Sequence, residues 1–579
     1  MATRNIVPRL TDEGGIGTSA KKWLSGWFNS LYSDNIGVGT STFGTSASKV
    51  MSIASSGAVA PVSSPADIAQ LWAADYNSAG TTRTYMRTEE GQIAPLATLN
   101  ETAVYYGVSW DESADTYVRT GRTVGCKVGV SLPVGMLPIQ ESMRGCLLAD
   151  DGTVNYYLCA TNWAYKEDGV TASDLTGTDG QVMVEIPKFW YRYKYLGTTH
   201  TWEVSPVPMS GFSVHPAFMS DTTELDYLYV GAYEGVLYDT SLSQYIAGCH
   251  QTAVSAGFDT SDDSITIATR TGWATNLVVG QELLLSGTAS NNGVVTVKTV
   301  ESGTKITVNE NLTSEAPTGA VIVAVLNTAN DKLCSISGYG AIGGTVSAGT
   351  RSHFRTWASN RGSGWSMDFS DSWAAQQLLY LTEYASFYSQ SVLGAGISNV
   401  ANWTAYNDGN PISKTGQGNS IGNASGNTAG SAVAATEASK YLKYRGIENP
   451  YGHIWKWVDG FNINNNIPYI CNNIANFADD TTSNYTRPKD VLGIDITMHN
   501  ADGYQATLAK SGRAFMPTSV GADGSHKITD YYYQITGWRV ASVSGYAIDV
   551  AIDGFFFLLA YYASSYLIRN LSARLCYRK

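Results

Sequence analysis

The stretch that decides the fold lies at residues 444–463 and reads YRGIENPYGHIWKWVDGFNI. Trp455 and Trp457 are separated by one residue, the spacing that puts two side chains on the same face of a strand. We therefore expect a strand here whose indoles fill the core of a domain with few long elements. Asp459 precedes Gly460, and we expect its carboxylate to cap a turn or to pair with a buried arginine, Arg574. The block predicts structure rather than catalysis.

The composition is that of a β-rich globular protein. At about 150 residues per domain, the 579-residue chain has room for about three or four domains. Only 15% of the residues are charged, whereas Gly and Tyr are abundant, and short strands joined by tight turns need these residue types. The net charge is −12 and Lys and Arg form no cluster. A phosphate backbone would be repelled, so we expect no nucleic-acid partner.

The most apolar segment of the chain lies close to its end and reads YAIDVAIDGFFFLLAYYASSYLIRN at 546–570. A membrane-spanning helix needs about 18 or more consecutive apolar residues. The run from Phe555 to Ala563 is too short, and Asp553 and Arg569 bracket it closely. We therefore expect no membrane insertion. Two alternatives remain for this segment, a buried core strand and an exposed binding surface.

Neither end of the chain nor its cysteines indicate a secreted protein or a metalloprotein. The first residues, MATRNIVPRLTDEGG, lack the apolar core of a signal peptide, so we expect synthesis in a cytoplasm. The seven cysteines are widely spaced and form no CxxC motif. This pattern favours buried thiols over a disulfide framework or a zinc site. We expect no metal and no cofactor, and nothing in the sequence supports calcium.

The amino-acid composition changes several times along the chain. The first 65 residues are small and polar, and SPADIAQLWAADY (64–76) predicts a short helix after them. Dense aromatic segments begin near residue 104, stop near 250 and resume near 327. The intervening segment alternates apolar and polar residues at period two between turn signals, which is typical of a small all-β module. The expected units are a tail-attachment or trimerisation segment (1–65), a linker or short helical connector (66–103), a discontinuous domain (104–250 and 327–579) and an inserted β module (251–326).

Two further elements are predicted inside the discontinuous domain. SWAAQQLLYLTEYASFYSQ (372–390) places its leucines on one helical face and predicts the one convincing helix. Glu383 lies among these apolar residues, and we interpret it as a hydrogen-bonded structural carboxylate. A strand is predicted over 181–197, QVMVEIPKFWYRYKYLG, because a glycine precedes this segment and another glycine ends it.

Three segments in this order resemble the C-type lectin-like fold in its formylglycine-generating-enzyme-type variant: the helix at 372–390, the block at 444–463 and the ending TGWRV…SARLCYRK. The resemblance covers most of the chain from about residue 180, without the inserted module. It implies an α+β fold, with a C-type lectin-like C-terminal domain, an inserted all-β module that is Ig-like or a small barrel, and a fibre-like β-rich N-terminal region. The residues that carry the frame, and that we expect to act as scaffold, are Trp455, Trp457, Asp459, Trp538, Arg539 and Arg574.

The final segment resembles the variable region that diversity-generating retroelements rewrite in one branch of this family. It keeps the fixed positions of that pattern at Gly537–Val540, Gly545, Gly554, Phe556, Ala563–Ser565, Arg569–Asn570 and Ala573–Leu575. The resemblance implies that the residues between them vary and bind a receptor. The expected receptor-binding residues are Tyr546, Ile548, Asp549, Ile552, Phe557, Leu559, Tyr561, Tyr562, Tyr566 and Ile568.

The genetic code offers a check on this interpretation. Randomising both adenines of an Asn codon yields residues such as Tyr, Ile, Asp, Leu or Phe, but never Lys, Glu, Gln, Met or Trp. None of those five residues occurs from Ala541 to Ile568, and Asn is absent too. A plain apolar core strand would also lack Lys and Glu, so the observation supports the hypothesis without excluding a core strand.

The front of the chain resembles phage tail-fibre proteins. Ile16-Gly17-Thr18 followed by AKKWLSGWF is similar to their N-terminal units, which pack around a threefold axis. The resemblance implies a non-enzymatic homotrimer at the tip of a virion tail fibre. Its partners would be tail or baseplate proteins at the N-terminus and a bacterial surface glycan or protein at the C-terminal domain. The alternatives are a bacterial or prophage-encoded ligand-binding protein outside a tail, and an oxidase-type enzyme on the same fold.

Overall fold

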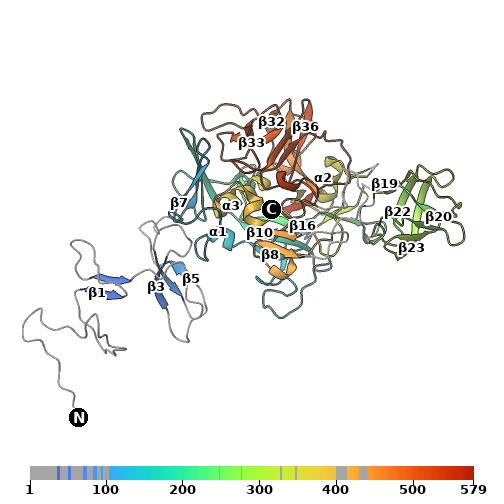
Figure 1. Cartoon of the computed structure of the whole chain (residues 1–579), viewed down its shortest axis with the longest axis horizontal. Helices are drawn as coiled ribbons and strands as arrows, with labels where there is room; N and C mark the ends of the chain where they lie inside the picture. The colour runs from blue at the N-terminus through green and yellow to red at the C-terminus, as the bar shows by residue number, and fades with distance from the viewer. Residues whose placement is uncertain are drawn as a thin grey trace, which may run out of the picture.

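The computed structural model describes residues 104–578 apart from 247, 249, 271, 276, 327–328, 346–347, 400–413 and 430–439, together with five short strands before residue 104. The protein is β-rich with few helices. Figure 1 shows a main body of packed sheets and, at one end of it, a small green module labelled β19, β20, β22 and β23.

A six-stranded sheet brings the two halves of the main body together. The last strand, β39, pairs with β16 on one side and with the edge strand β27 on the other, so the end of the chain lies inside the sheet. The core beneath it contains side chains from Tyr106 to Cys576. Segments 104–250 and 327–578 therefore share one core. The strand order is β27 (Trp365–Met367), β39 (Arg574–Tyr577), β16 (Tyr227–Glu234), β10 (Gln181–Pro187), β8 (Arg144–Leu148) and β9 (Val154–Tyr157).

A five-stranded antiparallel sheet packs beside it. The sequence predicted one strand over 181–197, but the structure has two strands that belong to different sheets, β10 and β11. The break falls at Pro187, which has no backbone N–H to donate to a ladder. That prediction was wrong in its extent. The order is β13 (Ser213–Val214), β11 (Trp190–Leu196), β12 (Thr199–Ser205), β6 (Tyr106–Asp111) and β7 (Thr116–Gly121).

The longest helix of the described part, α3 (Ser370–Tyr384), is buried along its whole length. It starts close to where the sequence predicts a helix but ends six residues early. Ala385 adopts a left-handed conformation with φ of 52°, which stops the helix, and a separate short helix, α4 (Ser389–Leu393), follows. Glu383 accepts hydrogen bonds from Arg445 Nη2 at 2.6 Å and Ser131 Oγ at 2.6 Å, as its interpretation as a structural carboxylate requires. The other helices are α1 (Pro138–Glu141) and α2 (Arg351–Ser359).

The segment between the two halves forms a seven-stranded sheet of its own. Every pairing in it is antiparallel, as the period-two pattern indicates. Its inner side is aliphatic, with residues such as Ile265, Leu283, Val297 and Ile322. The order is β19 (His250–Val254), β25 (Ala320–Ala324), β22 (Glu282–Ser286), β23 (Gly293–Ser302), β24 (Lys305–Val308), β21 (Ser264–Thr266) and β20 (Gly257–Asp259).

The C-terminal sheet carries the predicted scaffold and the predicted binding segment. Its one face, with Val458, Ile463 and Leu558, packs on the core that contains α3. Its other face carries Trp457, Val540 and Leu559. The order is β32 (Ile467–Ile470), β31 (Trp455–Asn464), β36 (Trp538–Val543), β37 (Leu558–Ala560), β35 (Tyr531–Gln534), β33 (Gly503–Leu508) and β34 (Pro517–Val520), with β38 (Leu571–Ser572) parallel to β31.

Short elements complete the molecule. Before residue 104, Gln70–Ala74 forms strand β3 of a three-stranded antiparallel sheet with β4 (Arg83–Arg87) and β5 (Ile93–Pro95), so the helix predicted over 64–76 is wrong there. The neighbouring strands contain β-branched and aromatic residues, which favour strand pairing over a helix in this segment. β1 (Asn35–Val38) and β2 (Val50–Ile53) pair in parallel, and the Ile16–Phe28 fibre-like unit lies outside the described residues. The remaining strands are β14 (Met219–Ser220), β15 (Thr223–Glu224), β17 (Val236–Asp239), β18 (Gln244–Ile246), β26 (Lys332–Cys334), β28 (Gly426–Ala429), β29 (Lys440–Tyr444) and β30 (Ile447–Glu448).

Candidate binding surface

The C-terminal segment begins with a turn that only small residues fit. Strand β36 ends at Val543, and Ser544 and Gly545 then have positive φ values of 84° and 73°. A side chain at Gly545 would place its Cβ 1.7 Å from Asp553 Oδ1, and one at Gly554 would place it 2.1 Å from Asp530 Oδ2. Both glycines of the predicted frame therefore have a packing reason, because buried carboxyl groups occupy the space that a Cβ needs.

Four tyrosines of this segment gather around Trp455, and we call these five residues the tyrosine stack. The Trp455 ring lies 4.5 Å from that of Tyr546 and 5.7 Å from that of Tyr562, measured between ring centroids. Tyr566 stacks on Tyr562 at 4.0 Å with 10° between the planes. Tyr561 meets Tyr562 edge-on at 5.5 Å. Tyr561 is 43% exposed and Tyr566 38% exposed, so the buried Trp455 and Tyr546 support an aromatic surface that faces solvent.

A second group of aromatic side chains continues this surface on β35 and β33. The rings of Tyr531 and Tyr533 lie 4.6 Å apart, and Tyr504 lies 5.2 Å from Tyr531. Tyr533 is opposite Leu559 in the parallel pair β35–β37, and the backbone N–H of Ile535 donates to Ala560 O at 3.2 Å. The three tyrosines are half-buried. The sequence analysis missed them. Tyr531 and Tyr533 lie on one face of β35, whereas Tyr532 lies on the other face and is buried.

The structure places the ten predicted receptor-binding residues at three depths. Two are exposed, Tyr561 and Tyr566, and three are half-buried, Ile548, Asp549 and Ile552. The other five are buried in the core that also contains Trp457 and Val540, so they are not part of an exposed patch. These five buried residues are Tyr546, Phe557, Leu559, Tyr562 and Ile568.

Asp549 anchors the segment from inside rather than presenting a charge to a ligand. Its Oδ2 accepts hydrogen bonds from Trp455 Nε1 at 3.1 Å and from the backbone N–H of Tyr546 at 3.0 Å. Burial raises the pKa of Asp549 from 3.8 to about 7, although these two hydrogen bonds act in the opposite direction. Burial, and then the neighbouring Asp549 carboxyl, hold the pKa of Asp553 well above its ordinary value. The base of the candidate surface therefore contains carboxyl groups that favour the neutral form.

A buried charged group lies beneath the same turn. Lys456 Nζ is 2.9 Å from Glu234 Oε1 and donates to Ser544 Oγ at 3.1 Å, and His453 Nδ1 bonds the other oxygen of Glu234. Burial alone would raise the pKa of Glu234, but His453 and Lys456 outweigh it and lower that pKa to about 2. Burial lowers the pKa of Lys456 to about 8. This group ties β31 and the turn at Ser544 to strand β16 of the neighbouring sheet.

The predicted scaffold residues are buried or half-buried, but one predicted pair is wrong. Trp455 and Trp457 lie in β31 and fill the core, as expected. Asp459 pairs with Arg355 of α2, at 2.7 Å from Oδ2 to Nε, rather than with Arg574. Arg574 instead donates to three backbone oxygens, which occupy its guanidinium.

Those three acceptors are Gly231 O at 2.8 Å, Glu448 O at 2.7 Å and Asn449 O at 3.1 Å. Arg574 thereby joins the strand that closes the domain to the Gly-Ile-Glu-Asn block. Trp538 and Arg539 are half-buried in β36, with the Trp538 ring 6.2 Å from that of Tyr469. Their place on the strand that leads into the candidate surface fits the expected scaffold role.

The described thiols have opposite pKa shifts, and a hydrogen bond with Thr161 lowers the pKa of the half-buried Cys159. The six cysteines that the structure describes form no disulfide bond with one another, and burial raises the pKa of the thiols of Cys471 and Cys576. Among the described side chains, no three His, Cys, Asp or Glu residues are grouped so that they would hold a metal ion. No helix in the described part of the chain combines the length and apolar character that a membrane crossing requires.

No protein-family model matches this chain, and no curated protein matches it either.

Proposed function

We propose that this protein binds a receptor on a bacterial surface through the tyrosine stack and the adjoining face of the C-terminal sheet. The observation that carries the proposal is the exposure of Tyr561 and Tyr566 on a buried aromatic base, in a segment that hydrogen bonds hold at Asp549 and at Phe556. Tyrosine offers a large contact area at a low entropy cost and a hydroxyl for adaptable hydrogen bonds. A glycan ring or a protein epitope fits such a surface.

We further propose the setting in which this binding takes place. The protein would be a phage tail-fibre receptor-binding protein, similar to phage tropism determinants. Its C-terminal region would be a C-type lectin-like variable domain, and its N-terminal region would attach to tail or baseplate proteins as a homotrimer. Support comes from the fixed positions of the C-terminal segment and from the packing reasons for Gly545 and Gly554. Trimerisation would raise a weak single-site affinity by avidity, about 10²- to 10⁴-fold where the geometry allows.

A substitution experiment tests the binding surface. The double variant Tyr561→Ala/Tyr566→Ala removes the two exposed rings and leaves Trp455 and Tyr546 in place. We expect it to bind receptor-bearing bacterial cells at least about 30-fold more weakly, the loss typical of a hot-spot contact of about 2 kcal/mol or more. Cells are identified first by screening a panel of strains with fluorescent wild-type protein.

A matched control separates this effect from a general loss of surface tyrosine. Tyr227 is 42% exposed on β16, outside the candidate surface, so Tyr227→Ala should bind cells as the wild type does. Unchanged binding of the double variant would refute the assignment of the surface. Sequencing the gene in sibling isolates tests diversification, and the idea fails if 546–568 never varies and no template repeat with a reverse transcriptase lies nearby. Light scattering measures the mass of the protein in solution, and a monomer would contradict the proposed trimer.

A further inference from the structure

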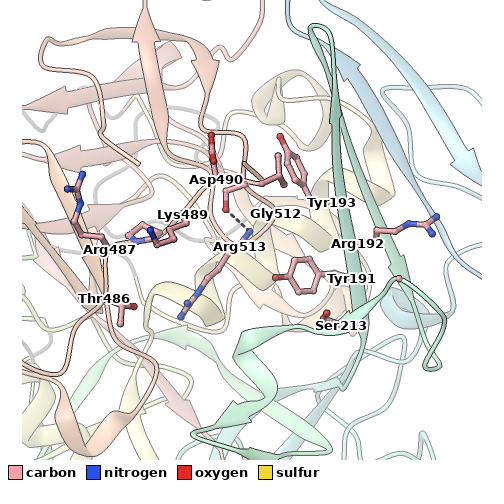
Figure 2. A pocket seen from close by; sticks show the side chains of 14 residues that line it. Tyr191, Arg192, Tyr193, Ser213, Thr486, Arg487, Lys489, Asp490, Gly512 and Arg513 are labelled. Atoms are coloured by element: carbon pink, nitrogen blue, oxygen red, sulfur yellow. Dashed lines mark hydrogen bonds between the residues drawn. The ribbon is translucent and has the colours of Figure 1, made fainter. Parts of the chain in front are cut away.

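A cavity lies away from the candidate surface and is lined by residues of a different chemistry. Figure 2 shows it between strand β11 and the loops 486–491 and 511–513. Its volume is about 500 Å³, within the range of small-molecule sites. None of its lining residues belongs to segment 546–568. The cavity is therefore a separate place at which a ligand would bind.

One wall of the cavity is aromatic. Tyr191 and Tyr193 alternate with Arg192 along β11, so the two rings share one face of the strand and Arg192 points to the other. Figure 2 shows Tyr191 directed toward the cavity and Arg192 directed away from it. Arg192 Nε is accordingly paired with Glu203 Oε2 at 2.7 Å on the far side.

This wall is held rigidly. The Tyr193 hydroxyl is 2.8 Å from His200 Nδ1, and His200 Nε2 is 3.1 Å from Glu112 Oε2. Gly512 packs against both rings from the floor of the cavity, since a Cβ on it would lie 2.4 Å from Tyr193 Cβ and 3.0 Å from Tyr191 Cε2. Burial raises the pKa of both tyrosines, so their hydroxyls stay neutral. The rings form a preorganised, uncharged platform.

The opposite wall is cationic. Arg487 Nη1 and Lys489 Nζ share one carboxylate, Asp495, at 3.2 Å and 3.0 Å. The Lys489 side chain is 62% exposed, and its Nζ also donates to Gly493 O at 3.3 Å. This pair carries two positive charges against one negative charge, in a chain whose net charge is −12.

The other charged groups of the cavity are already engaged. Asp490 Oδ1 accepts hydrogen bonds from the backbone N–H groups of Leu492 at 2.8 Å and Ile494 at 2.9 Å, and so holds the turn of this loop. Arg513 forms a two-pronged pair with Asp371, at 2.8 Å and 2.9 Å. The positive charge available to a ligand therefore lies at Lys489 and Arg487, across from the tyrosine wall.

We propose that this cavity binds an acidic saccharide, with a sugar ring against Tyr191 and Tyr193 and a carboxylate at Lys489 and Arg487. A sugar presents an apolar C–H face that packs on a tyrosine ring, and its hydroxyls match Ser213 and Thr486 in the lining. A carboxylate restores the charge balance of the Arg487–Lys489–Asp495 group through charge-assisted hydrogen bonds. A neutral sugar would gain the first contact but not the second. The inference does not rest on the proposed function of the tyrosine stack.

The test is calorimetric titration of the full chain with two acidic probes, trigalacturonate and 3′-sialyllactose, and with neutral galactotriose. We expect at least one acidic probe to bind at least tenfold more tightly than galactotriose, and its affinity to fall in 0.5 M salt because the charges are screened. Lys489→Ala should weaken acidic binding about tenfold, and Tyr191→Ala more than tenfold. Tyr191→Phe should retain binding, because the ring is kept.

Lys194→Ala is the matched control, because Lys194 lies on the same strand but on the face with Arg192 and pairs with Glu203. It should bind as the wild type does. The inference is overturned if neither acidic probe binds, if galactotriose binds equally well, or if Lys489→Ala binds unchanged. The Tyr561→Ala/Tyr566→Ala variant should bind the acidic probe normally. A negative result for saccharide binding in the cavity would therefore not affect the proposal that the tyrosine stack binds cells. A negative result for cell binding would likewise not affect the cavity proposal.

Discussion

Replacing Asp549 by Asn should make the protein less sensitive to pH and more stable above neutrality. In the structure the Asp549 carboxyl accepts hydrogen bonds from Trp455 Nε1 and from the backbone N–H of Tyr546. An Asn side chain has almost the same shape, and its carbonyl oxygen accepts the same two hydrogen bonds. The substitution therefore removes the ionisation of this group while keeping its contacts.

The magnitude follows from the pKa of Asp549. Burial raises this pKa from 3.8 to about 7, so the folded protein holds the proton more tightly than the unfolded chain does. For a group whose folded pKa is raised, the stabilisation is present below the unfolded pKa and is lost as pH rises through the folded pKa. At 1.36 kcal/mol per pH unit, the wild type loses about 4 kcal/mol between pH 4 and pH 8 through this one group.

Urea unfolding followed by tryptophan fluorescence at pH 5, 6, 7 and 8 measures this difference. We expect Asp549→Asn to be the more stable at all four pH values, by about 1.6 kcal/mol at pH 5 and by about 4 kcal/mol at pH 8. Asp530 and Lys456 titrate in both proteins, so their contributions largely cancel in the comparison. After burial, the Asp549 charge helps to raise the pKa of Asp553, so losing it lowers that pKa and adds to the stability of the variant at high pH. Parallel curves at all four pH values, or a less stable Asn variant at pH 8, would refute the interior placement of Asp549.

Three other predictions follow from buried groups and from the inserted module. Asp459→Ala removes the fully buried partner of Arg355, which keeps Asp479, and should lower the free energy of unfolding by about 1.5–3 kcal/mol in urea, whereas Asp226→Ala, at the exposed end of its pair with Lys188, should not move the midpoint. Gly545→Ala places a Cβ 1.7 Å from Asp553 Oδ1 at a φ of 73°, and the left-handed backbone alone costs about 1–2 kcal/mol, so an unchanged melting temperature would contradict the packing of this turn. Residues 250–326 expressed alone should fold, since their seven strands pair with one another, and dispersed amide resonances in an NMR spectrum would show it, while a collapsed spectrum would count against an autonomous module.

The sequence predicted elements well where a single pattern dominated. The period-two alternation of 251–326 and the Trp455–Trp457 spacing both indicated strands, and both are strands. Prediction failed where a local break or a distant partner decided the outcome. Pro187 divides a long apolar run between two sheets, and Ala385 ends α3 early. In the 64–76 segment, pairing with β4 outweighs the helical pattern, because sheet pairing depends on residues that are not neighbours in the sequence.

The candidate surface shows the same limit. The fixed glycines and Trp455 were identified from their pattern, but the burial of each tyrosine was not. The sequence does not distinguish a buried tyrosine that supports the surface from an exposed tyrosine that forms it. Tyr531 and Tyr533 lie outside the frame of the variable region, yet strand pairing brings them beside Leu559. Asp459 likewise finds Arg355 on α2, a partner 104 residues away that no local pattern connects to it.

These depths sharpen what diversification of the C-terminal segment would look like. Replacing a buried aromatic side chain such as Tyr546 or Phe557 by a small one leaves a cavity and costs about 3–5 kcal/mol, a large part of the stability of a domain. Replacing Tyr561 or Tyr566 removes side chains that already face solvent and leaves the core intact. If adenine-directed mutagenesis rewrites this segment, sibling genes should therefore vary freely at Tyr561, Tyr566, Ile548 and Ile552, and should keep large apolar residues at Tyr546, Phe557 and Leu559. Equal variation at buried and exposed positions would contradict this packing, because a core cannot accept every substitution and still support the surface above it.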